Sequence, residues 1–283
     1  MRAVYQGILV FSPLILIVVI FFYLPVLESF LKSLQDLDGS YIGFERYIDL
    51  LTDREFMDAF WLTIEVAFAS TVISIILAIA ISLALRDTFV GKKLALFLNQ
   101  MNISTPHMIM ATMMVYLLGQ KGFISIVLYN MGLIDSWNEF PQFVEYTSPW
   151  GVIVSYTLKF TPFICLSVLA VLQSMSQDFE DQSITLGVGK VRTFFHVTLP
   201  SIWPAIMSTA IMSFTYAFGS FEVPMTLLTR KVLSTLVYND YYDFYNPYGT
   251  LEGYAGSMIM TAIVMVLATI FLYISSKRSD ALE

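Results

Sequence analysis

DQSITLGVGKVRTFFHVTLP, residues 181 to 200, is a polar stretch that lies between two long apolar segments. Acidic residues gather around its start, where they complement the positive end of a helix dipole, so we predict a helix that begins near residue 177. Gly187 and Gly189 can leave the right-handed helical region at no steric cost, which places a turn there. A second short helix follows, and Pro200 and Pro204 are expected to end it. The stretch therefore predicts a helix-turn-helix between two membrane-spanning segments.

The spacing of this stretch resembles the EAA loop of ABC importer permeases, the segment on which the ATPase subunit docks. The resemblance places the acid-small-small triplet, the central glycine and the aliphatic-x-Leu-Pro ending on Asp181, Gln182, Ser183, Gly187, Val197, Leu199 and Pro200. Phe194, on the second short helix, is assigned to the same ATPase-coupling contact. The triplet departs from Glu-Ala-Ala, whereas the glycine and the Leu-Pro match. An ordinary solvated loop is the alternative, but such a loop rarely combines this spacing with exposed aromatic residues.

The composition indicates an integral membrane protein. Hydrophobic residues make up 57% of the chain and charged residues 13%, compared with about 25% charged residues in a typical soluble domain. Several apolar stretches reach the ~20 residues that one bilayer crossing needs; they are 8–30, 62–85, 94–118, 151–175, 205–228 and 255–275. The predicted fold is an all-α membrane protein with six transmembrane helices. A single transmembrane domain is expected over 1–283, with the coupling loop at 176–204 between helices 4 and 5.

Charged residues set the orientation that we expect for these spans. With both termini in the cytoplasm, the inner segments hold Arg2, Arg86, Lys92, Lys93, Lys190, Arg192, Lys277 and Arg278. The outer loops carry more acidic than basic residues, so most of the formal charge of −7 lies outside. This orientation places the EAA-like loop in the cytoplasm, and the lack of a basic stripe argues against a nucleic-acid partner.

Three segments depart from simple spans. The outer segment from Lys32 to Asp58 has an amphipathic pattern and is expected to lie along the membrane surface. The third span is interrupted at Pro106 and His107, and such residues usually face the helix bundle or a cavity. The last outer loop, 229–254, is rich in tyrosine and acidic residues. We interpret its tyrosines as an aromatic belt at the membrane boundary, and a binding role is the alternative.

The sequence carries no recognisable catalytic or metal-binding motif. GVGK at 187–190 differs from a phosphate-binding loop, because Val191 stands at the Ser/Thr position and Ile184 at the first glycine position. His107 and His196 stand apart, and no HExxH, CxxC or GxSxG occurs, so we expect neither a metal site nor an active site. The resemblance to importer permeases implies that ATP and magnesium bind to separate ATPase subunits, with no cofactor on this chain.

Three charged residues, Glu65, Lys159 and Glu222, lie inside predicted spans. A charge at the centre of a membrane helix costs roughly 2.5–3.5 kcal/mol on insertion scales, so each should face protein or water and mark the substrate pathway. Pro224 is expected to break the fifth span beside Glu222, next to a cavity. The sequence leaves two alternatives for Lys159 and Glu222: a structural ion pair, or direct contact with the substrate.

Two phrases, SYTLKFTPF around Lys159 and FGSFEVPMTLL around Glu222, resemble permeases of the polyamine, ferric-iron and phosphonate group. With the EAA-like loop, they identify the chain by resemblance as the permease subunit of a binding-protein-dependent ABC importer in the bacterial cytoplasmic membrane. The resemblance implies a second permease subunit, two ATP-binding subunits, an external solute-binding protein and membrane lipid as partners.

Acidic residues on the outer face and in spans two and five favour a polyamine substrate such as spermidine or putrescine. Carbohydrate, phosphonate or iron uptake is the alternative, and Lys159 is easier to explain with these substrates. A secondary transporter or a channel would carry the same spans and buried charges. Neither would need the EAA-like loop, so the importer is the prediction.

Overall fold

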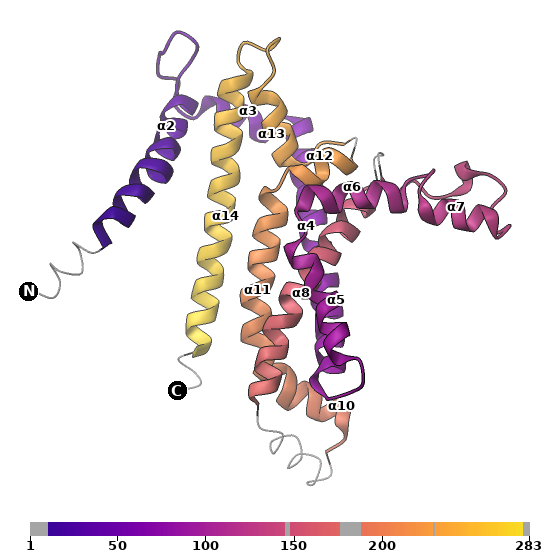
Figure 1. Cartoon of the computed structure of the whole chain (residues 1–283). Coiled ribbons are helices and arrows are strands. Elements are labelled where there is room, and N and C mark those ends of the chain that lie inside the picture. Colours follow the sequence, from indigo (N-terminus) through magenta and orange to yellow (C-terminus); the bar gives the residue numbers. More distant parts are fainter. Residues whose placement is uncertain (1–10, 145–147, 176–187, 229, 280–283) are drawn as a thin grey trace, which may run out of the picture. The chain divides into compact units, whose positions relative to one another are not determined.

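The computed structural model describes residues 11–144, 148–175, 188–228 and 230–279 (Figure 1). Within these ranges the chain is helical and forms no β-strand; an isolated antiparallel bridge joins Gln35 to Tyr41. Helices long and apolar enough to cross a membrane are Phe11–Ser33, Arg54–Arg86, His107–Asn130, Trp150–Ser174, Lys190–Gly219 and Gly249–Ile270. The prediction of an all-α protein with six spans is confirmed.

The described residues divide into two compact units. One consists of the residues up to Asp58 together with Ser234–Met265, and the other of Ala59–Leu233 together with the residues from Val266 onward. Helices α4 (Arg54–Arg86) and α14 (Gly249–Ser279) each contribute residues to both units.

The first unit contains the first span and a short hairpin that follows it. The span passes through a π-helical turn, η1 (Val19–Tyr23), into α2 (Leu24–Ser33), and α3 (Glu45–Thr52) comes after the connecting turns. Arg46 of α3 is 7% exposed, and its Nη1 donates to the carbonyl oxygens of Ser33 at 3.1 Å and Gln35 at 2.8 Å. This guanidinium therefore ties α3 to the end of α2.

Two glycines let α14 approach α13 (Leu233–Tyr241) closely within the same unit. A β-carbon on Gly253 would lie 2.7 Å from the Cβ of Tyr241, and one on Gly256 would lie 2.6 Å from a methyl carbon of Val237. Only glycine therefore fits at these positions without movement of α13.

The second span begins earlier than the sequence predicts. α4 starts at Arg54 rather than near residue 62, because Asp53 caps it: its Oδ2 accepts a hydrogen bond of 2.8 Å from the backbone N–H of Phe56. Phe56 is 1% exposed as part of this helix. The segment predicted to lie on the membrane surface therefore ends at α3.

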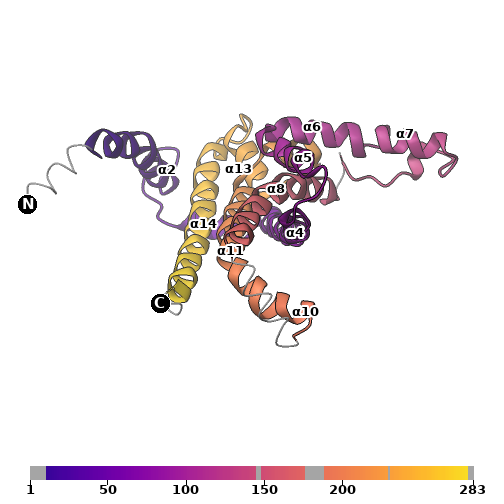
Figure 2. The same cartoon turned by 60° about the horizontal axis from the view of Figure 1, so that its bottom comes forward.

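Helix α8 (Trp150–Ser174) is the most buried of the candidate spans in the described chain. It packs against α11 (Leu199–Gly219), α5 (Lys92–Ser104) and α6 (His107–Leu118) within the second unit. Figure 1 and Figure 2 both show α8 running beside α11. α8 is therefore the helix around which this unit is organised.

Small polar residues of α4 face α8. Ser74 Oγ donates to the carbonyl oxygen of Thr157 at 3.3 Å, and Ser82 Oγ donates to that of Cys165 at 3.0 Å. Small side chains let two membrane helices approach, and their hydroxyls bond across the interface. Cys165 is buried in this contact, as a packing residue would be.

The third span differs in part from its predicted limits. The interruption at Pro106 and His107 is confirmed, because α5 ends at Ser104 and α6 begins at His107. The apolar stretch long enough to span is His107–Asn130, which adds α7 (Phe123–Asn130) to α6, whereas the predicted span 94–118 joins α5 to α6.

Three prolines have a different effect from the predicted one. Pro200 lies in the first turn of α11 and Pro204 inside it, so neither ends a helix, and the chain is continuous from α10 (Lys190–Thr193) through η3 (Phe194–Thr198) into α11. The break in the fifth span comes at Ser220, where the backbone is extended, and Pro224 lies within the next helix, α12 (Glu222–Leu227). Pro224 is tolerated because it lies in the first turn of α12, where the N–H groups need no helical partner.

Candidate functional site

A cavity of about 240 Å³ lies between α5, α6, α8 and α11 in the second unit. Its walls come from the broken third span, from α8 and from α11; the lining residues are Ile103, His107, Lys159, Phe160, Phe163, Met212, Ser213 and Tyr216. The lining is largely aromatic and apolar, with a few polar groups. Binding sites for small molecules commonly have this composition.

Lys159 is 8% exposed and reaches from α8 to the end of α5. Its Nζ donates hydrogen bonds to the carbonyl oxygens of Asn102 at 2.6 Å, of Ile103 at 2.9 Å, and of Thr105. In a continuous helix the carbonyl of Asn102 would bond to the N–H of residue 106, but Pro106 has none. Lys159 therefore supplies the donor that the interrupted span lacks.

Glu222 is satisfied by a different partner. Its Oε2 accepts a hydrogen bond of 2.8 Å from the hydroxyl of Ser220, two residues before α12 begins. Among the residues that the structure describes, no ion pair joins Lys159 to Glu222. Helix α12, which begins at Glu222, packs against α6 and α8, two of the helices that line the cavity.

Four rings form a cluster at the cavity. His107 stacks on Tyr216 with ring centres 4.3 Å apart, and Tyr156 stacks on Phe160 at 5.4 Å. Tyr216 meets both Tyr156 and Phe160 edge to face, at 6.4 and 6.1 Å. Tyr156 is fully buried, and the side chain of Ser220 lies beside its hydroxyl.

This cluster is not among the sites predicted from the sequence. The spacing of Tyr156 and Phe160, four residues apart on a helix, was the signal that could have placed these two on one face. Tyr216 belongs to a different span, and no local pattern relates it to α8.

Glu65 and Pro224 do not line the cavity. Glu65 is exposed on α4, on a face that it shares with the exposed side chains of Trp61 and Phe68. Pro224 is buried in the first turn of α12. Of the predicted pathway residues, the structure places Lys159 in the cavity wall and Glu222 beside it.

Part of the predicted ATPase-coupling set lies outside the described residues, namely Asp181, Gln182, Ser183 and Gly187. Phe194 and Val197 lie in η3, and Leu199 and Pro200 begin α11. Phe194 lines a groove of about 430 Å³ whose other walls are Leu83, Arg86, Lys190, Val191, Thr193 and Thr198. The end of α4 therefore completes this surface, a contribution that the loop sequence alone does not reveal.

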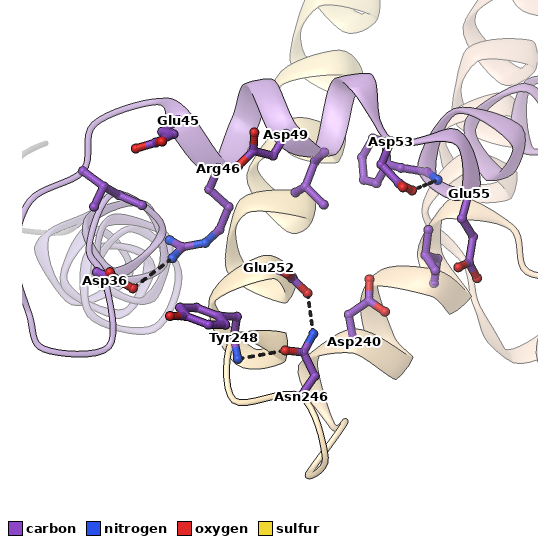
Figure 3. Close-up of a pocket in the computed structure, with 14 residues that line it drawn as sticks. Asp36, Glu45, Arg46, Asp49, Asp53, Glu55, Asp240, Asn246, Tyr248 and Glu252 are labelled. Carbon is purple, nitrogen blue, oxygen red and sulfur yellow. Dashed lines mark hydrogen bonds and ion pairs between the residues drawn. The ribbon is translucent and has the colours of Figure 1, made fainter.

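The first unit has its own hollow, of about 670 Å³, formed by α3 and by parts of α4, α13 and α14 (Figure 3). Carboxylates dominate its lining; they belong to Asp36, Glu45, Asp49, Asp53, Glu55, Asp240 and Glu252. Arg46 is the only Lys or Arg among its lining residues, with Nη2 3.9 Å from Asp36 Oδ1. Asn246 Nδ2 donates to Glu252 Oε2 at 2.8 Å. In the described part of the chain no group of His, Cys, Asp or Glu is placed to hold a metal ion.

Known proteins resemble this chain over nearly its whole length. It is 25% identical to the sn-glycerol-3-phosphate transport system permease protein UgpA of Shigella dysenteriae serotype 1 over 286 residues, which is 95% of this chain and 94% of that protein. It is 26% identical to UgpA of Salmonella typhi over 290 residues, with the same coverage.

Solved structures share the fold. A bacterial ABC transporter involved in the import of the acidic polysaccharide alginate gives a TM-score of 0.79 at 18% identity, covering 98% of both chains. The MetNI methionine ABC transporter gives 0.54 at 15% identity, covering 84% of this chain and 99% of that one.

These relatives correct the resemblance to the polyamine, ferric-iron and phosphonate group, since the curated relatives named above are glycerol-phosphate permeases. The phrase around Lys159 has a structural role that explains its sequence, because the lysine bonds to the end of α5. Residues 70–281 match the family described as binding-protein-dependent transport system inner membrane component. With this match covering most of the chain, the protein belongs to that family of ABC importer permeases.

Proposed function

We propose that this importer permease carries a carbohydrate-class solute rather than a polyamine. The observation that carries the proposal is the aromatic cavity beside α8, in which Lys159, the one Lys or Arg among the described lining residues, is bonded to backbone carbonyls. The names of the relatives support it, because they move glycerol phosphate or import a polysaccharide. Glu65, one of the acids that suggested a polyamine, lies away from this cavity.

The proposed assembly has four kinds of partner. A second permease subunit would complete the path, two ATP-binding subunits would hold ATP and magnesium, and an external binding protein would deliver the solute. The fold is that of a transporter also solved in complex with an alginate pentasaccharide-bound periplasmic protein, at a TM-score of 0.76 and 18% identity. The chain itself would hold no cofactor, and both of its termini would lie in the cytoplasm.

The helix that runs from the groove to the cavity supports a coupling mechanism. Lys190–Gly219 is a continuous stretch of 30 residues, or about 45 Å at 1.5 Å per residue. Phe194 lies near one end of it, in the groove, and Tyr216 near the other, in the cavity. A displacement of the groove by the ATPase would therefore move a cavity wall through one helical stretch, which contains the π-helical turn η3 and Pro204. Such a movement can alternate the access of the cavity between the two sides of the membrane.

An uptake experiment tests the proposal. The affinity-tagged chain is extracted gently from its native membranes, the copurifying proteins are identified, and the complex is reconstituted in proteoliposomes with its binding protein. ATP-dependent uptake is then measured for radiolabelled sugars, sugar phosphates and spermidine. We expect copurified ATPase subunits and uptake of a carbohydrate-class solute. Uptake of spermidine alone would refute the substrate class, and uptake that needs no ATPase would refute the importer.

A further inference from the structure

Resting on the proposed function, one more inference concerns the second permease subunit and the surface that it covers. We propose that the exposed face of α4 around Glu65 packs against a helix of a second permease of different sequence, and that this helix presents a Lys or Arg residue to Glu65. The residues of this face, the Glu65 face, are Trp61, Glu65, Phe68, Ile76, Ala80 and Ala84.

The Glu65 face is one stripe on the side of α4 that is turned away from α8. Its residues recur at intervals of three, four or eight positions, which is the repeat of a single helix face. Nine residues separate Glu65 from Ser74, or about two and a half helical turns. Ser74 is buried and bonds to the carbonyl oxygen of Thr157 on α8 at 3.3 Å. Glu65 therefore points away from the helix that α4 packs against.

Glu65 stands alone as a charge in the apolar part of α4. Between Ala59 and Leu85 it is the only Asp, Glu, Lys or Arg. Trp61, of a residue type that gathers at membrane boundaries, lies one turn closer to the start of the helix. A charge inside a span is costly unless it faces protein or water. Among the residues that the structure describes, no ion pair involves Glu65, so a counter-charge on a neighbouring chain would remove this cost.

The remainder of the Glu65 face is suited to contact with a membrane helix. Trp61, Phe68 and Ile76 are large apolar side chains that are each more than 60% exposed. Ala80 and Ala84 are exposed four positions apart, and small residues at this spacing let a second membrane helix approach closely. Lipid tails would cover the apolar side chains as well, but they offer no donor to a carboxylate. The charge and the small residues together therefore favour a protein neighbour.

The charge of this face also selects a neighbour of different sequence. Two copies of one chain that pair about a two-fold axis along the membrane normal bring the same surface together at the same depth. Two α4 helices would then set Glu65 against Glu65, and like charges repel strongly in a medium of low dielectric constant. Lys and Arg occur in α4 only at its ends, at Arg54 and Arg86. Lys159 is bonded to carbonyls inside its own bundle. A different chain with a basic residue meets the requirement.

Photocrosslinking identifies the neighbour of the Glu65 face in the complete transporter. Cells that express the whole transporter carry p-benzoylphenylalanine at Phe68; they are irradiated, and the adduct is identified by mass spectrometry. We expect an adduct with a different multi-span protein, on a helix that has a Lys or Arg near the attachment point. The same probe at Phe244, which is 93% exposed outside the Glu65 face, is the control and should not give this adduct. An adduct with lipid only, with a second copy of this chain or with another segment of the same chain would overturn the inference.

A charge exchange tests the pairing of Glu65 directly. The amount of second permease that copurifies with the tagged chain is measured after gentle extraction. We expect Glu65→Lys to lower this amount about tenfold or more, and a Glu in place of the second permease's Lys or Arg to restore it. Asp135→Lys, on an exposed acid outside the described helices, is the control and should leave it unchanged. A wild-type amount in Glu65→Lys, or no recovery in the exchanged pair, would contradict the pairing.

Failure of this inference can be told apart from failure of the proposed function. Copurified ATPase subunits and ATP-dependent uptake by the wild-type complex support the importer whichever neighbour the crosslink finds. With both present, an adduct between two copies of this chain would overturn the Glu65 face alone. With neither present, the importer and the inference would both fall. The crosslink at Phe68 keeps Glu65 intact, so it decides the question even where Glu65→Lys fails to insert.

Discussion

Lys159 on α8 donates a 2.6 Å hydrogen bond to the backbone carbonyl of Asn102 on α5, the carbonyl whose helical donor is missing because residue 106 is proline. The contact joins two membrane helices at the point where one of them is broken. It also engages the ammonium group of Lys159, which the sequence suggested as a partner for Glu222 or for the solute. The charge is therefore used to stabilise the fold.

This relationship predicts the effect of removing the lysine. Lys159→Met removes the donor to the partly buried carbonyls of Asn102, Ile103 and Thr105, and an unsatisfied buried group costs about 1–3 kcal/mol. We expect a clear fall in the melting temperature of the detergent-solubilised protein. Thermal unfolding is measured without a thiol-reactive dye. Lys93→Met, on an exposed lysine of α5, should leave the melting temperature unchanged.

A double variant tests whether Glu222 is the partner of Lys159. If the two formed a structural pair, Lys159→Met with Glu222→Gln would recover much of the lost stability. Because the lysine bonds to carbonyls and the glutamate to Ser220, we expect the two effects to add without recovery. Restoration of the wild-type melting temperature would refute the capping role.

The hairpin of the first unit should depend on Arg46. Arg46→Met removes the donor to the carbonyl of Ser33, in a buried contact, and the donor to the carbonyl of Gln35, in a partly buried one. We expect a loss of stability of about 1–3 kcal/mol and faster proteolysis between α2 and α3. Arg54→Met is the matched control, because its side chain is 95% exposed. Equal proteolysis of the two variants would show that Arg46 does not tie the hairpin.

The orientation in the membrane can be tested with single cysteines on a Cys165→Ser background. Val191 is 72% exposed in the groove, and Tyr245 is 98% exposed between α13 and α14. With both termini in the cytoplasm, an impermeant maleimide should label Tyr245→Cys on intact cells. Val191→Cys should react only after the membrane is permeabilised. The reverse pattern would invert the topology.

Hydropathy predicts the six spans because membrane solubility is a property of each local segment. It misses the start of α4, since Arg54, Glu55 and Asp58 make the first turns polar although Asp53 caps the helix there. The interruption at Pro106 is likewise local and could be predicted. The break at Ser220 could not, because the sequence draws attention to Pro224 instead.

The site depends on contacts between distant segments, and these limit what the sequence can predict. Lys159 and Glu222 stand out because charges are rare in spans, but their partners Asn102 and Ser220 have no visible pattern. Tyr216 joins His107 and Tyr156 only because α11 packs against α8 and α6 begins beside them. The sequence therefore identifies Lys159 and Glu222 as unusual charges inside spans, but it does not show which groups they contact.

The central claim, that the groove at Phe194 couples ATP hydrolysis to the cavity through one continuous helix, is tested most directly by binding-protein-stimulated ATPase activity. The complete transporter is reconstituted in proteoliposomes, and ATP hydrolysis is measured with and without solute-loaded binding protein. In Phe194→Glu, which places a charge in the groove, we expect the stimulation and the uptake to be lost while the membrane subunit still inserts. Phe244→Ala, on a side chain 93% exposed outside the groove, should keep both. Full stimulation and uptake in Phe194→Glu would contradict the account.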